Sequence, residues 1–358
     1  MSDFSPHLTG GYHFASRSSA TDWFGSPTPF VRHTALLDRF FPGDAPKWSD
    51  ALVARTRRHI AGCMNSAEVA LRMALGEHVQ ATALDGLASG LCWGVLEHNP
   101  AAISGDLFAH FRVRAALSLL ESPNNTAVHP DGTVSFDDDE ETAVRDAALA
   151  LSLALMRWRD GGDEMASMRA DLPAEQMHTL VWITAAILAQ AIAPMNIMPH
   201  GALLGAIEAA GQHVLAAQDE QQGAFGQAAL LAHLLHQRAI DSTKLEQLAQ
   251  DGHFLLLFAI VADRCNLNAP DVASAIVHGT ARDAHLLFRA ADMPPACYAI
   301  TLLALRQVRD GASDQQLGAL FDGYGALSVD EARTDIMPLA LSAGLRNAFA
   351  RLGEGSHP

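Results

Sequence analysis

The stretch that decides the fold is DLPAEQMHTLVWITAAILAQAI, residues 171–192. Asp171 is suited to cap a helix start, and Pro173 and Glu175 then fall in the first turn, where a missing N–H and a negative charge are both tolerated. From position 179 onward, two threonines and one glutamine are the only polar residues of this stretch. The predicted helix is therefore apolar nearly all round, and we expect neighbouring helices to cover it on most sides.

We expect this helix to form the structural core, with Trp182 buried at the centre of the fold. The other core residues predicted on it are Leu180, Ile183, Ile187 and Leu188. The apolar run ends at Pro194, and it is interrupted by polar residues, whereas a membrane span needs about 20 apolar residues. The sequence analysis therefore favours a core helix over a membrane span.

Composition and charge limit the class of protein. The chain has 358 residues, 49% of them hydrophobic, and its alanine and leucine content favours helix over strand. A formal net charge of −16 argues against sequence-independent nucleic-acid binding and against docking on anionic lipid. The negative net charge is compatible with protein partners and with cationic ligands. The four cysteines have no Cys-x-x-Cys pairing, which indicates reduced thiols, and we expect a cytoplasmic protein with no signal peptide.

The chain divides into predicted segments. Residues 1–30 form a flexible arm that Trp23 and Phe24 could anchor, and residues 31–121 form an N-terminal helical block. A Pro-Asp-Gly turn signal places a loop or small hairpin at 122–140. A C-terminal block at 141–351 and a tail at 352–358 follow.

Helical patterns recur through both blocks. Because the later helices are short and closely spaced, we predict an all-α fold in which helix pairs pack as a HEAT-like helical-repeat array, or α-solenoid. The ranges expected to be helical are 31–41, 50–62, 66–79, 82–98, 104–121, 141–158, 174–193, 200–217, 222–239, 243–250, 253–265, 270–278, 281–291, 294–309, 313–322 and 329–351.

Three stretches resemble a known family. They are LLDRFFPGDAPKWSDALVARTRRHIAGCMNSAEVALRMAL, DLPAEQMHTLVWITAAIL and LLLFAIVADRCNLNAPDVASAIVHGTARDAHLLFRAADMP. They resemble alphaproteobacterial proteins of the domain of unknown function 2336, over roughly residues 31–310. The resemblance implies an all-α bacterial cytoplasmic protein, regulatory in role, and it carries over no catalytic residues.

Three groups of residues are candidates for metal binding or phosphoryl transfer, and each also has a simpler interpretation. His233 and His236 share a helical face and suit zinc, but the sequence near them supplies no further ligand. The acidic run Asp137 to Glu141 is similar to the magnesium motifs of terpenoid synthases, yet a second such motif is missing, so a solvated helix start is favoured. His59, beside two arginines, could accept a phosphoryl group, although a solvated helix face is the simpler interpretation.

The function predicted from the sequence is a non-enzymatic protein-interaction or regulatory module. An array of helix pairs presents an extended concave surface, and the negative charge suits a basic protein partner. We expect no cofactor, no bound metal, no nucleic acid and no membrane, and homo-oligomers remain open. The alternatives are a phosphotransfer or metal-dependent enzyme, and a small-molecule sensor with an apolar pocket between helices.

Overall fold

The structure is a computed structural model of the chain, and it describes residues 48–76, 78–79, 84–121, 142–158, 166–308, 317–318, 321–341 and 345. The predicted N-terminal arm, the loop or hairpin at 122–140, the acidic run Asp137 to Glu141 and the tail at 352–358 lie outside these residues. The boundaries predicted there stay predictions.

Helices make up the regular structure of the described ranges, apart from an isolated bridge residue at Trp48. The all-α prediction is therefore confirmed for this part of the chain. The α-helices are α2 (Asp50–Leu75), α4 (Leu91–His98), α5 (Gly105–Leu120), α6 (Thr142–Met156), α7 (Ala174–Ile192), α8 (His200–Ala216), α9 (Ala224–Gln237), α10 (Ser242–Gln250), α11 (Phe254–Cys265), α12 (Ala269–His278), α13 (Ala281–Ala290), α14 (Pro295–Leu305) and α16 (Val329–Ile336). Short 3₁₀ turns are η2 (Pro100–Ala102), η3 (Ala193–Met195), η4 (Glu220–Gln222), η5 (Tyr324–Ala326) and η6 (Met337–Ala340).

The first described helix is longer than the sequence predicted. We expected separate helices on either side of Asn65, but α2 runs without a break from Asp50 to Leu75. Asn65 is buried inside this helix rather than capping a new one. A cap residue is effective only where the backbone leaves the helix, and here the packing of α2 along α5, α7 and α8 holds it continuous.

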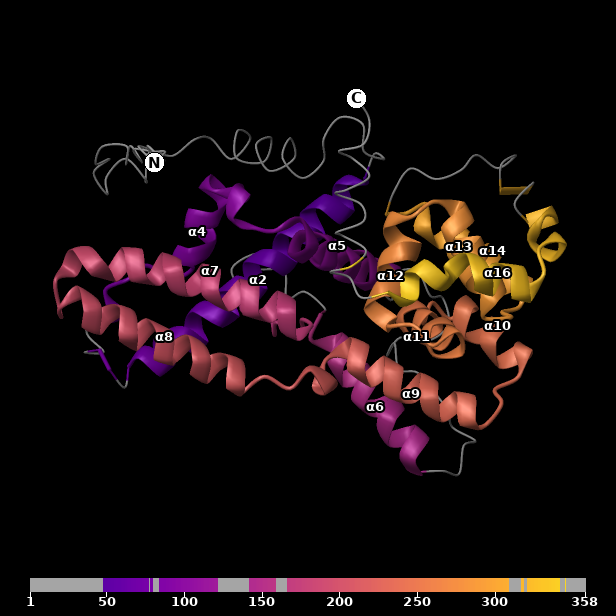
Figure 1. The fold of residues 1–358 in the computed structure, drawn as a ribbon, viewed down its shortest axis with the longest axis horizontal. Coiled ribbons are helices and arrows are strands. Elements are labelled where there is room, and N and C mark those ends of the chain that lie inside the picture. Colours follow the sequence, from indigo (N-terminus) through magenta and orange to yellow (C-terminus); the bar gives the residue numbers. More distant parts are fainter. Residues whose placement is uncertain are drawn as a thin grey trace, which may run out of the picture.

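Two hydrophobic clusters make up the interior. One is built from α4, α7, α8 and the adjacent parts of α2 and α5. The other is built from α6, the helices from α9 onward and the far end of α5. Figure 1 shows the two groups of helices side by side along the long axis, with α5 reaching from one into the other. Helices α2 and α5 pack on each other and contribute to both clusters, so they form a common spine.

Helix α7 is less enclosed than expected. Leu180, Ile187 and Leu188 are buried, as predicted, but Trp182 and Ile183 are only half-buried. The buried face of α7 packs against α2, α4, α5 and α8. Trp182 lies about 200° round the helix from Leu180. There it packs over Gly211 of α8 and stays partly exposed, so the prediction of a buried, central tryptophan is wrong.

The segment Ala174–Met195 is long and apolar enough to cross a membrane by length and composition, and 39% of its most apolar window is buried in the protein. Our sequence argument that this run is too short is therefore wrong as to length. Its contacts with α2 and α8 are those of a helix packed against a protein core.

Candidate functional site

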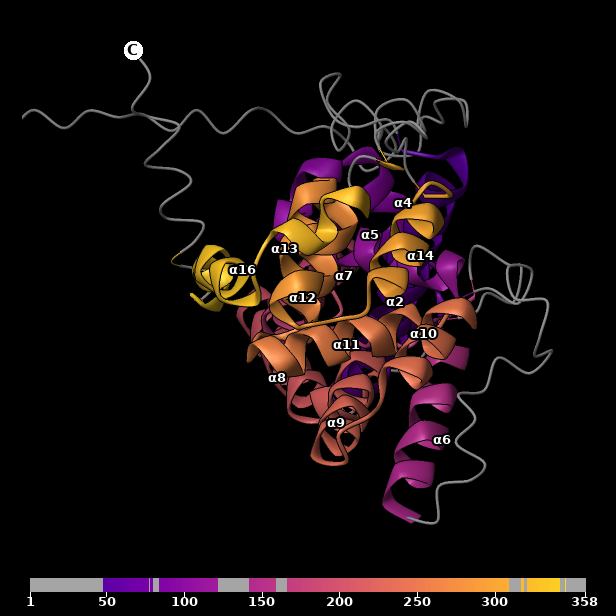
Figure 2. The ribbon, with the colours of Figure 1, turned by 90° about the vertical axis from the view of Figure 1, so that its right-hand side faces the viewer.

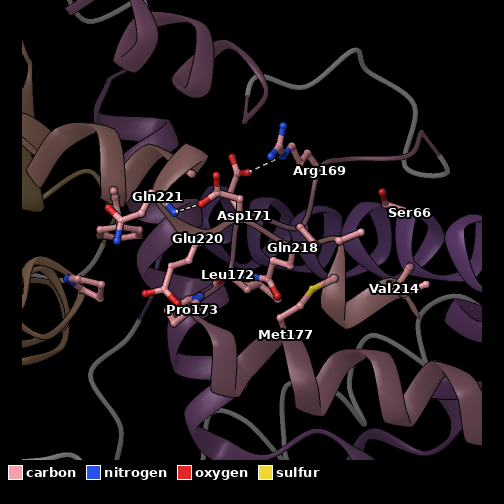
Figure 3. Close-up of a pocket in the computed structure, with 18 of the residues that line it drawn as sticks. Ser66, Arg169, Asp171, Leu172, Pro173, Met177, Val214, Gln218, Glu220 and Gln221 are labelled. Atoms are coloured by element: carbon pink, nitrogen blue, oxygen red, sulfur yellow. Dashed lines mark hydrogen bonds and ion pairs between the residues drawn. The ribbon is translucent and has the colours of Figure 1, made fainter. Parts of the chain in front are cut away.

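A cleft lies where the two hydrophobic clusters meet. Its volume is about 420 Å³, within the range of ligand pockets. One wall is α2, and the opposite walls are the ends of α8, α9 and α12. The segment that leads into α7, residues 169–173, lines the cleft, as the close-up in Figure 3 shows.

The cleft has an apolar floor and an acidic edge. Buried side chains of the floor come from five helices: Ala67, Met177, Val214, Phe225 and Ala269. At the edge, Asp219 and Glu220 are exposed to solvent. Among the residues that line the cleft, the acidic groups are Asp171, Asp219 and Glu220, and the basic group is Arg169, so the lining carries an excess of negative charge.

The edge is ordered by hydrogen bonds to the backbone. Asp219 caps the 3₁₀ turn η4, because its Oδ1 accepts the N–H of Gln221 at 3.0 Å. Glu220 Oε2 accepts the N–H of Ala174, the first residue of α7, at 3.0 Å. Gly226 lies against this turn, and a Cβ there would come within 2.7 Å of the Gln221 carbonyl oxygen. The Gln222 side chain also donates through Nε2 to Asp219 Oδ2 at 2.9 Å, so backbone N–H groups hold both carboxylates and one side chain adds to the hold on Asp219.

Asp171 does not cap α7, contrary to our prediction. Pro173 is the N-cap residue of this helix, and it makes no side-chain cap. The Asp171 carboxylate instead turns inward, where its side chain is 2% exposed and pairs with Arg169 Nε at 3.2 Å. Trp158 Nε1 donates a second hydrogen bond to it at 3.2 Å. Burial raises the pKa of Asp171, against the lowering effects of Arg114, Arg169 and the Trp158 hydrogen bond.

A fully buried arginine holds the segment 169–173 in place through a hydrogen bond to its backbone. Arg114 of α5 donates through Nη2 to the carbonyl oxygen of Arg169 at 2.9 Å. Its Nη1 lies 3.2 Å from Cys63 Sγ of α2, and its Cζ lies 5.1 Å from the Trp158 ring centroid. Arg114 therefore joins the spine helices to the wall of the cleft. Sequence reasoning missed it, although a charge inside the apolar run of residues 107–120 was a usable signal.

Two buried histidines lie beside Arg114. His59 on α2 is fully buried, with its Nε2 3.4 Å from Ser118 Oγ, so it is neither a solvated residue nor an accessible phosphoacceptor. Burial, followed by the charges of Arg114, Arg55 and Arg58, lowers the pKa of His59 well below its usual value. Burial and Arg114 lower the pKa of His110 to about 3. Both imidazoles are therefore neutral at physiological pH.

The paired histidines on α9 have a partner that the sequence did not reveal. His233 Nδ1 lies 3.2 Å from Asp263 Oδ1 of α11, and His236 Nδ1 hydrogen-bonds the other oxygen of the same carboxylate. The three groups bind one another at the surface. In the ranges that the structure describes, no group of three or more His, Cys, Asp or Glu side chains is arranged to hold a metal ion.

Comparisons with known proteins match part of the chain to a family model. Residues 163–336 match the model of a family described as "Uncharacterised protein conserved in bacteria (DUF2336)". The match begins later and ends later than the roughly 31–310 expected from the sequence. It contains every residue that lines the cleft except Ser66, Ala67 and Ala70 of α2. No curated protein and no solved structure matches the chain.

Proposed function

We propose that the protein is a non-enzymatic, regulatory interaction module of the bacterial cytoplasm, and that it binds a basic segment of a partner protein in the cleft. The observation that supports this is the pair of exposed carboxylates, Asp219 and Glu220, at the edge of a buried apolar floor. The family match is compatible with this proposal but supplies no activity.

A lysine or arginine side chain fits this combination of surfaces. Its methylene stem is apolar and its end is cationic, so it buries the stem while the charge stays near solvent. The floor around Met177 and Phe225 would cover the stem, and the edge would face the charge. The net charge of −16 adds a long-range field that attracts basic partners.

The HEAT-like arrangement is part of the same proposal. Consecutive helices from α11 to α14 pack on their neighbours, as helices do in an array of pairs. Helix α10 packs on α14 as well as on its neighbour α11, and a simple linear array does not predict the contact with α14. The proposed array therefore covers α11 to α14, and α9 and α10 close one side of it.

A cationic small molecule is the second candidate occupant. The volume of about 420 Å³ favours it, because pockets of this size hold small ligands. In this alternative the protein is a sensor, and binding does not depend on a peptide backbone. The same cleft residues would carry both functions, so probes of different size distinguish them.

The test is a binding titration with the full chain. A fluorescent peptide rich in Arg and Lys, a matched acidic peptide, spermidine and duplex DNA serve as probes, over a series of salt concentrations. The cleft variant Asp219→Asn/Glu220→Gln keeps the shape and most hydrogen bonds of the edge. The control variant Glu208→Gln/Asp330→Asn removes the same charge from exposed positions away from the cleft.

We expect the basic peptide to bind, to weaken about tenfold in the cleft variant and to be unchanged in the control, since each exposed charge pair contributes about 0.2–1 kcal/mol. Binding should also weaken as salt rises. Equal affinity in the two variants, or equal affinity for the acidic peptide, would contradict the proposal. Binding of spermidine without the peptide would favour the small-molecule alternative, and tight DNA binding would contradict the charge argument.

A further inference from the structure

Helix α6 carries an apolar stripe that no other part of the described protein covers. Leu149 is 58% exposed, Leu153 is 49% exposed and Met156 is 55% exposed. The opposite side of the helix, which includes Val144, Ala148 and Leu151, is buried against α9 and the rest of its cluster. Figures 1 and 2 both show α6 at the lower edge of the molecule, where a second molecule can approach it.

The three residues form a continuous surface. At 100° per residue, they lie within about 60° of one another on the helix. Single exposed apolar residues are common, whereas a stripe along about two turns of one helix marks a site of association.

The charges that flank the stripe indicate what covers it. Asp146 lies near its N-terminal end and Arg157 near its C-terminal end, eleven positions apart, and both are exposed. Arg157 is the first residue of the turn that follows α6. Continued by that one residue, the helical geometry puts both on one flank of the stripe, separated by about 17 Å along the axis. Arg145 lies on the other flank.

A second copy of α6 matches this pattern when it runs antiparallel. A two-fold axis perpendicular to the helices exchanges the two ends and keeps each flank on its own side. Asp146 then faces Arg157 of the partner subunit, and the same pair forms again at the other end. Between the two pairs, Leu149 and Leu153 interdigitate with their symmetry mates.

We propose that the protein forms a homodimer through an antiparallel pair of α6 helices. The stripe is its apolar centre, and two symmetric ion pairs set the direction and register of the helices. The contact does not use the edge of the cleft, so this proposal stands independently of the proposed function.

The first test measures molar mass by sedimentation equilibrium of the full chain. We expect the wild type to approach twice the chain mass of 38.2 kDa at tens of micromolar. Leu149→Asp/Leu153→Asp should sediment as a monomer. Met73→Asp, at a residue of α2 that is 75% exposed, is the matched control and should stay dimeric. Circular dichroism checks that each variant is folded.

The second test exchanges the charges. Asp146→Arg and Arg157→Asp should each weaken the dimer about tenfold, because each change makes both symmetric pairs repulsive. An equimolar mixture of the two variants should restore it, because every facing pair is then of opposite sign. A monomeric wild type, a dimer that persists in the Leu149→Asp/Leu153→Asp variant, or a mixture no tighter than the separate variants would each overturn the proposal.

Discussion

Gly211 of α8 lies directly under the indole ring of Trp182, and this contact gives the sharpest test of how α7 and α8 pack. A Cβ at Gly211 would come within 2.6 Å of Trp182 Cζ3 and within 2.7 Å of Cη2. Gly205, on the same helix, has no neighbouring atom within 4 Å of the position of a Cβ. The two glycines are therefore matched for helix position and differ in what a methyl group would meet.

The expected magnitudes follow from this difference. Glycine to alanine inside a helix stabilises a protein by about 0.5–1 kcal/mol, and Gly205→Ala should show that gain. At Gly211 the same gain is opposed by overpacking, which costs about 1–3 kcal/mol. The Trp182 ring can move aside only by straining its 2.9 Å hydrogen bond to His178, which contributes about 0.5–1.5 kcal/mol. We expect Gly211→Ala to be less stable than Gly205→Ala by about 2 kcal/mol.

Urea denaturation in two backgrounds measures this contact. In the Trp182→Ala background no ring opposes the methyl group, so Gly211→Ala should become stabilising, like Gly205→Ala. Trp182→Ala itself should cost less than the roughly 3–5 kcal/mol of a fully buried aromatic, since the ring is half-buried. If Gly211→Ala has the same effect with and without the ring, the packing of α8 on Trp182 is not as described.

Three further predictions concern buried groups. The pKa of His110 is about 3 in the folded chain and near 6.5 in the unfolded chain, so the unfolded chain takes up the proton first as pH falls. The free energy of unfolding should therefore decrease as pH drops below about 6.5, by up to roughly 1.4 kcal/mol per pH unit. His110→Gln should flatten that slope between pH 7 and pH 5 in urea titrations, and an unchanged slope would assign it to other groups. Burial raises the pKa of the Cys63, Cys92 and Cys297 thiols, to about 12 for Cys297. Dithionitrobenzoate should therefore label these thiols only after denaturation. Rapid labelling of the native protein would show that they are accessible. Gly62→Ala should destabilise the fold by about 1–3 kcal/mol, because a Cβ would lie 2.7 Å from Met168 Cβ, and a melting temperature equal to that of wild type would contradict this close approach.

Local sequence patterns were sufficient for most of the helix starts. The expected starts of α5 and of α8 to α14 lie within about two residues of those observed, and Ser49 and Ser104 cap their helices through hydrogen bonds of 3.2 Å to backbone N–H groups. Glu68 and Arg72, four positions apart on α2, form an ion pair at 2.5 Å. Such features depend on residues within about four positions of one another, so the sequence is enough to predict them.

Contacts between segments distant in sequence bring the walls of the candidate site together. Asp171 was read as a helix cap, but Arg169 and Trp158 draw its carboxylate inward. His59 was expected at the surface, yet α2 turns that face toward α5. The composition of α7 predicted a helix covered on most sides, but in the structure Trp182 packs on Gly211 of α8 and is only half-buried. Periodicity specifies which residues share a face of a helix, whereas the free energy of packing the whole chain decides which face is covered, and by what.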